Sequence, residues 1–165
     1  MLENEAVPIM ELCHRYNVPL IINDRVNVAA EIHADGVHIG QSDMDAAKAR
    51  KILGPDSIIG VTAKTVEQAL KAQAEGADYL GSGAVFGTTT KSDAKPMDID
   101  TLNAICDSVD IPVVAIGGIN NDNVMKLSGS RIAGIAVVSG IFDNEDIKGA
   151  AQSLRAKALN IISGR

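Results

Sequence analysis

The feature of this sequence that most limits its fold is a regular alternation of short apolar runs with longer segments of helical spacing. The runs predict strands at residues 19–23, 36–39, 57–61, 79–85, 112–116 and 134–138. The other segments predict helices at residues 8–16, 25–32, 44–53, 66–75, 99–108, 121–126 and 146–162. Because the runs are apolar almost throughout, the strands are expected to be parallel and covered on both faces, which is an α/β fold.

Local signals mark both ends of the helix predicted at residues 66–75. Thr65 stands directly before it and Gln68 follows three positions later, which is the spacing of a capping box. Gly76 stands where the helix should end, because glycine readily adopts the left-handed conformation that closes many helices.

Similar phrases lead into three of the strands: HADGVHIG from residue 33, EGADYLGSG from residue 75 and SRIAGIAVVSG from residue 130. Such repetition with one strand per unit favours a (β/α)8 TIM-barrel type over a doubly wound sheet, in which a single Gly-rich turn would stand out. Since only six strands are predicted, we expect an incomplete barrel with about six of the eight parallel strands. It would form a single domain over residues 1–165 that lacks its N-terminal βαβ portion.

Two absent strands would leave two sheet edges with unpaired backbone groups. Another chain or a domain swap would cover these edges, or the chain is a fragment of a longer protein. The sequence leaves these alternatives open, and a homo-oligomer or edge pairing is expected.

Charge and composition argue against several classes of partner. A net charge of -6 and a pI near 5.0 disfavour nucleic acids and anionic membranes, and an aromatic content of 2% leaves few rings to stack on bases. No apolar stretch approaches the ~18 residues of a membrane span, and the first residues lack the basic segment of a signal peptide. We therefore expect a cytoplasmic protein with no nucleic-acid or membrane partner.

Polar residues and glycines follow nearly every predicted strand, and in barrels of this type these positions gather at the functional face. Asp24 and Asp43 follow adjacent strands, so their carboxylates are candidates to bind one Mg2+ together with substrate phosphates. Capping of the following helices is the alternative, because each Asp stands close to a predicted helix start. The spacing alone leaves both hypotheses open.

Two further features suit a phosphorylated ligand. The stretch 87–96 is long for a strand-to-helix connection and carries hydroxyls and two lysines, although an ordinary solvated loop has a similar composition. Gly117 and Gly118 follow one strand, and Ser139 and Gly140 follow the next, so both supply bare backbone for a phosphate.

The three histidines have no adjacent nucleophile motif, and His38 stands within a predicted strand. A packing role is therefore the favoured interpretation for His14, His33 and His38.

The combination of motifs resembles the thiamine phosphate synthase family, in the same order and at matching spacing over essentially the whole chain. The matching stretches are IINDR at 21–25, ADGVHIGQSD at 34–43, GVTAKT at 60–65, GADYLGSGAVFGTTTK at 76–91, IPVVAIGGIN at 111–120 and GIAVVSGIF at 134–142. The resemblance implies a (β/α)8 barrel that joins hydroxymethylpyrimidine diphosphate to thiazole phosphate, giving thiamine phosphate and pyrophosphate.

The resemblance also implies roles for individual residues. Asp24 and Asp43 match the family's Mg2+ ligands, and with Lys91 they form the implied catalytic set. The implied substrate-binding residues are Asn23, Thr62 and Lys91 for the diphosphate, and Thr88, Thr90, Gly118, Val138 and Ser139 for the thiazole phosphate. The implied mechanism is dissociative: Mg2+ and Lys91 stabilise the leaving pyrophosphate, and the thiazole nitrogen captures the pyrimidinyl cation.

The chain departs from the family pattern in one major respect. A Q-x-R-x-K stretch that helps to bind the diphosphate has no equivalent here, so the chain alone is expected to lose activity that a complete barrel would have. Ser42 stands where Glu is common, and Thr62 stands where Ser is common but keeps the hydroxyl.

Two alternatives to the synthase are a non-catalytic phosphate-binding or assembly fragment of the barrel and a thiazole tautomerase-like enzyme. The combination of Asp24, Asp43 and Lys91 favours the synthase, because a tautomerase has no use for paired Mg2+ ligands and a diphosphate-binding lysine.

Overall fold

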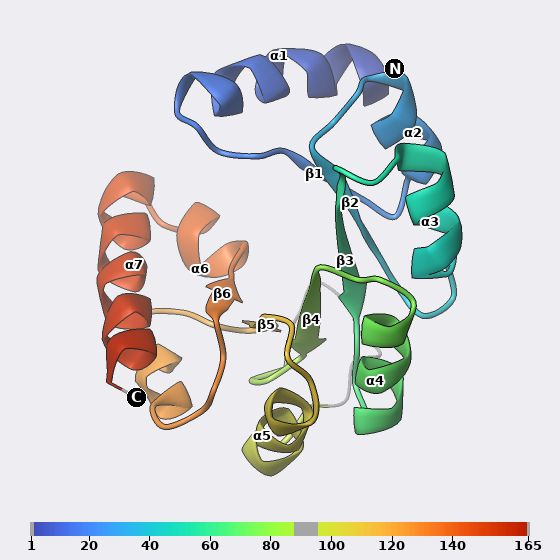
Figure 1. Ribbon diagram of the computed structural model, residues 1–165. Coiled ribbons are helices and arrows are strands. Elements are labelled where there is room, and N and C mark those ends of the chain that lie inside the picture. Colours follow the sequence, from blue (N-terminus) through green and yellow to red (C-terminus); the bar gives the residue numbers. More distant parts are fainter. Residues whose placement is uncertain (1, 88–95, 165) are drawn as a thin grey trace. The chain divides into compact units, whose positions relative to one another are not determined.

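The computed structural model describes residues 2–87 and 96–164 (Figure 1). The chain divides into two compact units: Met1–Thr62 with Lys71–Tyr79, and Ala63–Leu70 with Leu80–Arg165. Among the described residues, no helix combines the length and the apolar character that crossing a membrane requires.

The first unit is built around three parallel strands. Its elements are α1 (Leu2–Arg15), β1 (Ile21–Asn23), α2 (Val26–Glu31), β2 (Gly36–Ile39), α3 (Ala46–Leu53) and β3 (Ile58–Thr62). Strand β2 pairs with β1 through Asn23 opposite His38, and with β3 through His38 opposite Gly60. Helix α4 (Val66–Ala74) and strand β4 (Tyr79–Gly83) each contribute residues to both units.

The second unit continues the same alternation. It adds α5 (Ile99–Ser108), β5 (Val113–Ile116), the 3-10 helix η1 (Val124–Leu127), β6 (Gly134–Ala136), α6 (Ser139–Phe142) and α7 (Ile147–Ser163). Strand β5 runs parallel to β4 and to β6. The strands follow the chain in the order β1 to β6, which is the arrangement of a TIM-type barrel with six of its eight parallel strands. The predicted fold class is therefore confirmed.

Two aspartates hold the amino ends of strands in the first unit. Asp35, just before β2, accepts hydrogen bonds from the Leu20 amide at 2.7 Å and from His14 at 2.8 Å. Asp78, just before β4, accepts from the Ile59 amide at 2.7 Å and from Arg50 at 2.7 Å. The same device thus ties neighbouring strands together twice.

The acid strength of Asp35 reflects these contacts. Burial alone raises the pKa of this carboxyl, but the hydrogen bonds from His14 and from the Leu20 amide, together with the charge of His14, outweigh burial. The pKa of Asp35 therefore lies below its ordinary value of 3.8.

The predicted signals around α4 are present. The Gln68 amide donates to the Thr65 hydroxyl at 3.2 Å, and the Gln68 side chain accepts from the Lys64 amide at 2.7 Å. Gly76 follows the helix with φ +86°, so the left-handed ending that its sequence position indicates is also observed.

Two predictions are wrong after β5 and β6: one helix and the end of one strand. The helix expected at residues 121–126 is replaced by the 3-10 helix Val124–Leu127, because Asn120 Oδ1 accepts from the amides of Asp122 and Asn123 and holds a turn there. The strand expected to reach residue 138 ends at Ala136, and α6 follows. Its N-cap residue is Val138, which makes no side-chain cap, so the sequence carries no start signal for this helix.

Candidate functional site

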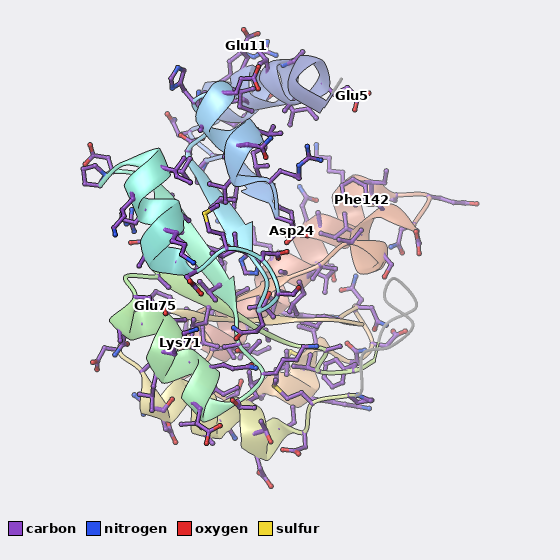
Figure 2. All side chains as sticks on the ribbon, turned by 90° about the vertical axis from the view of Figure 1, so that its right-hand side faces the viewer. Glu5, Glu11, Asp24, Lys71, Glu75 and Phe142 are labelled. Atoms are coloured by element: carbon purple, nitrogen blue, oxygen red, sulfur yellow. The ribbon has the colours of Figure 1, made fainter. Side chains whose placement is uncertain are left out.

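The end of β1 carries two exposed polar side chains that contact each other. Asn23 Nδ2 donates to Asp24 Oδ2 at 2.7 Å, and the Asp24 amide donates to the His38 carbonyl of β2 at 2.7 Å. Asp24, which is labelled in Figure 2, has φ +62°, a left-handed backbone conformation. The backbone hydrogen bonds between β1 and β2 therefore extend to Asp24 and hold the backbone that carries its carboxylate.

The end of β2 places the second predicted metal ligand. Asp43 Oδ2 accepts from the Gly40 amide at 2.8 Å, and the Asp43 amide donates to the Gly40 carbonyl at 3.2 Å. Helix α3 begins only at Ala46, and its N-cap is Asp45. Asp43 therefore closes a turn after β2, and the helix-capping hypothesis does not describe its contact.

These two carboxylates stand at the carboxyl ends of paired strands in the same unit. Carboxylate oxygens are hard ligands of the kind that Mg2+ takes, usually one or two of them alongside water and substrate phosphates. Within residues 2–87 and 96–164, no group of three or more His, Cys, Asp or Glu side chains gathers for a metal. Two carboxylates are the kind of protein donors that a phosphate-bound Mg2+ takes, so a Mg2+ site at Asp24 and Asp43 stays a prediction.

Thr62, at the end of β3, lies in a network of side chains from the same unit. Its hydroxyl is 3.0 Å from His38 Nε2, and its carbonyl accepts from Gln41 Nε2 at 2.6 Å. His38 Nδ1 is in turn 3.0 Å from the Tyr79 hydroxyl. Burial raises the pKa of Tyr79, so this phenol stays protonated.

The sequence favours a packing role for His38 and does not predict its contacts with Thr62 and Tyr79. The sequence signal was a polar residue within an otherwise apolar strand, but its partners depend on the register of β2 with β3. That register places His38 opposite Gly60, two residues before Thr62.

In the second unit, the predicted bare-backbone positions bring chain segments into close contact. Gly118 has φ +67°, and a Cβ atom there would collide with the Gly87 carbonyl oxygen. The Gly118 carbonyl accepts from Asn123 Nδ2 at 2.8 Å. A Cβ atom at Gly140 would likewise overlap the Ile119 carbonyl oxygen. Close packing of these turns therefore requires the glycines, whether or not a phosphate also uses them.

The other predicted positions divide into two groups. Val138 is exposed and precedes α6, and Ser139 is the first residue of that helix. Thr88, Thr90 and Lys91 lie outside the described residues, so their predicted roles stay predictions.

Comparisons with known proteins give a consistent result. A sequence model of the thiamine monophosphate synthase family matches residues 1–141. A thiamine-phosphate synthase of Clostridium tetani is 54% identical over 149 residues, which are 90% of this chain and 71% of that protein. Thiamine-phosphate synthase 2 of Streptococcus pneumoniae is 49% identical over 158 residues, which are 96% of this chain and 75% of that protein.

Solved structures agree with these sequence relatives. A thiamine phosphate pyrophosphorylase from Pyrococcus furiosus superimposes with a TM-score of 0.89 at 39% identity, covering 97% of this chain and 77% of that one. KGPDC from Streptococcus mutans gives a TM-score of 0.71 at 16% identity over 94% of this chain and 79% of its own, which shows a shared fold alone.

Proposed function

Because this chain belongs to the thiamine monophosphate synthase family, we propose that it joins hydroxymethylpyrimidine diphosphate to thiazole phosphate, giving thiamine phosphate and pyrophosphate. The observation that carries the proposal is the family match over residues 1–141. That stretch contains every position predicted for the metal and for the two substrates, from Asn23 to Ser139.

The reaction needs charge neutralisation more than proton transfer. The bond between the pyrimidine methylene carbon and the diphosphate oxygen breaks, and its electron pair leaves with pyrophosphate. The thiazole nitrogen then donates its lone pair to the methylene carbon and forms the new bond. Groups that stabilise negative charge on the departing diphosphate therefore accelerate the first step.

The residues of the first unit suit that task. Asp24 and Asp43 would hold Mg2+, which when bound supplies positive charge to the diphosphate. Asn23 and Thr62 offer an amide and a hydroxyl as neutral donors to phosphoryl oxygens. Lys91, which belongs to the second unit and lies outside the described residues, would add a cationic donor to the leaving group by the family resemblance alone.

The second unit would take the thiazole phosphate. The backbone at Gly118, Val138 and Ser139 is proposed to face the phosphate, with the hydroxyls of Thr88 and Thr90. Thr88 and Thr90 are assigned by the family resemblance alone.

We also propose that the chain associates with a second copy or pairs a sheet edge with another polypeptide. An apolar groove of about 400 Å3 lies beside β6, between α6 and α7 in the second unit, and Ile135, Leu154, Leu159 and Ile162 line it. Leu159 of α7 lines this groove and is 45% exposed. Apolar surface of this kind favours a covering partner. The cytoplasmic location and the absence of nucleic-acid and membrane partners stay predictions.

Release of pyrophosphate tests the function directly. The chain is assayed with both substrates and Mg2+, alone and joined to the N-terminal βαβ portion that the family resemblance implies. Release that needs Mg2+ and both substrates is expected at least from the joined protein, and Lys91→Ala should abolish it while the exposed control Lys51→Ala should not. Absence of release from both proteins would overturn the proposal in favour of a non-catalytic fragment, and thiazole isomerisation without Mg2+ would favour a tautomerase.

A further inference from the structure

Three side chains of the first unit, carried by β2, β3 and the first residue of β4, form a hydrogen-bonded series. Tyr79 of β4 contacts His38 Nδ1 at 3.0 Å, and His38 Nε2 contacts the Thr62 hydroxyl of β3 at 3.0 Å. The rings of His38 and Tyr79 lie with centroids 5.4 Å apart and planes at 38°. All three side chains are partly buried, so their hydrogen bonds are stronger than at an exposed surface.

The backbone leaves space for this series of side chains and holds the segment that carries Tyr79. A Cβ atom at Gly60 would overlap the ring of Tyr79, so only glycine at this position lets the phenol reach His38. The residue before Tyr79 is Asp78, which the Ile59 amide and Arg50 hold at 2.7 Å each. The backbone just before Tyr79 is therefore held in place, and the Tyr79 hydroxyl lies 3.0 Å from His38 Nδ1.

Neutral imidazole carries one N–H donor and one acceptor nitrogen, so the side chains of Tyr79, His38 and Thr62 have two possible proton arrangements. In the first, the Tyr79 hydroxyl donates to Nδ1, and Nε2–H donates to the Thr62 oxygen. In the second, Thr62 donates to Nε2, and Nδ1–H donates to Tyr79. Phenols are more acidic than aliphatic alcohols and so are better donors, which favours the first arrangement.

The first arrangement leaves the Thr62 hydroxyl proton uncommitted to the ring. Since the oxygen of Thr62 already accepts from His38, its proton points elsewhere and is available to an external acceptor. The Thr62 carbonyl accepts separately from Gln41 at 2.6 Å, which holds the backbone at this residue and leaves the hydroxyl proton free to rotate toward an external acceptor. In the second arrangement, the Thr62 hydroxyl donates this proton to His38 Nε2 and cannot donate it to a ligand.

We propose that His38, held by Tyr79, is a positioning residue that keeps the Thr62 hydroxyl as a donor to a phosphoryl oxygen of the diphosphate. The identity of that ligand rests on the proposed function. The proton arrangement rests only on the contacts among His38, Tyr79 and Thr62.

The tautomer of His38 is measured first, by long-range 15N–1H NMR on the full chain at about pH 8, where an ordinary imidazole is neutral. The proton is expected on Nε2, with Nδ1 as the acceptor. A His38 protonated on Nδ1 would overturn the inference whatever the chain binds.

Binding of inorganic pyrophosphate with Mg2+ is then measured by calorimetry. Thr62→Val and His38→Asn should each weaken binding about tenfold, because each removes the oriented donor to a charged acceptor. His38→Gln, whose longer amide can still donate to Thr62, should restore most of the affinity. The control His33→Asn changes an exposed histidine and should leave affinity unchanged.

The double variant Thr62→Val with His38→Asn separates positioning from a general structural effect. If His38 acts through Thr62, the double variant binds no more weakly than Thr62→Val alone. Losses that multiply to about a hundredfold would overturn the inference while leaving the proposed function intact. No binding by the unaltered chain, alone or joined to the implied βαβ portion, would instead reject the diphosphate as ligand and the proposed function with it.

Discussion

Oδ2 of Asp43 lies 2.8 Å from the amide nitrogen of Gly40, so the backbone itself holds this carboxylate at the end of β2. An asparagine at the same position keeps an oxygen that can accept from Gly40 and loses only the charge. Position 43 therefore allows metal binding to be separated from folding by a single substitution.

Asp43→Asn should fold as the unaltered chain does and lose Mg2+-dependent chemistry. We expect the free energy of unfolding to change by less than about 0.5 kcal/mol, and pyrophosphate release by the joined protein to fall at least about 100-fold. Urea unfolding and release at several Mg2+ concentrations measure the two effects. Asp56→Asn, an exposed loop aspartate, is the matched control. Unchanged release in Asp43→Asn would remove Asp43 from the metal site.

Gly118→Ala should destabilise the protein more than Gly54→Ala does. Both glycines have positive φ, +67° and +94°, so alanine is strained at each by about 1 kcal/mol. Only at Gly118 would the new Cβ collide with a backbone carbonyl, that of Gly87, whereas Gly54 faces open space. We expect a difference of about 2 kcal/mol between the variants in urea unfolding. Equal losses of unfolding free energy in the two variants would show that the turn after β5 can shift to accept a Cβ atom at position 118.

Asp35→Asn should destabilise the protein at neutral pH and not in acid. The folded pKa of Asp35 is below the ordinary 3.8, so its charge stabilises the native state above about pH 4. This contribution disappears as the pH falls through the lowered folded pKa. We expect a loss of about 1 kcal/mol at pH 7 that shrinks steadily below pH 4. The free energy of unfolding of both proteins across this range tests the sign, and a gap that widens in acid would contradict it.

Leu159→Lys should reduce self-association if the groove on α7 is a contact surface. Leu159 lines the groove and is 45% exposed, so a charge there would be costly to bury against a partner. Leu70→Lys on α4 is the control, because Leu70 is 46% exposed and lies outside the groove. Sedimentation over a range of concentrations is expected to show association that only Leu159→Lys weakens. Equal behaviour of both variants would exclude the groove.

Strand positions and fold class could be predicted because they depend on local apolar patterns. The strand Gly36–Ile39 and the helix Ile99–Ser108 have the predicted boundaries, and Thr65 and Gly76 mark the ends of α4 as expected. These features need only the order of residues along one short segment.

Features that depend on register or on side-chain networks could not be predicted. The contacts of His38 follow from its position opposite Gly60, and a sequence alone does not reveal that pairing. Asp43 could be read as a helix cap because the turn with Gly40 leaves no distinct pattern. The helix Ser139–Phe142 was missed since its N-cap Val138 offers no capping side chain. In each case the structure depends on the folded backbone, which sets which residues lie close enough to interact.

The glycine at position 60 also limits how this chain can diverge. A Cβ atom at position 60 would overlap the ring of Tyr79, so any larger residue at position 60 requires a smaller residue at position 79. In proteins descended from this one, a substitution of Tyr79 by a smaller residue should come before any substitution of Gly60. The first of these substitutions would remove the hydrogen-bond partner of His38 Nδ1. The order of mutations at this pair is therefore constrained, and the two positions should drift together rather than independently.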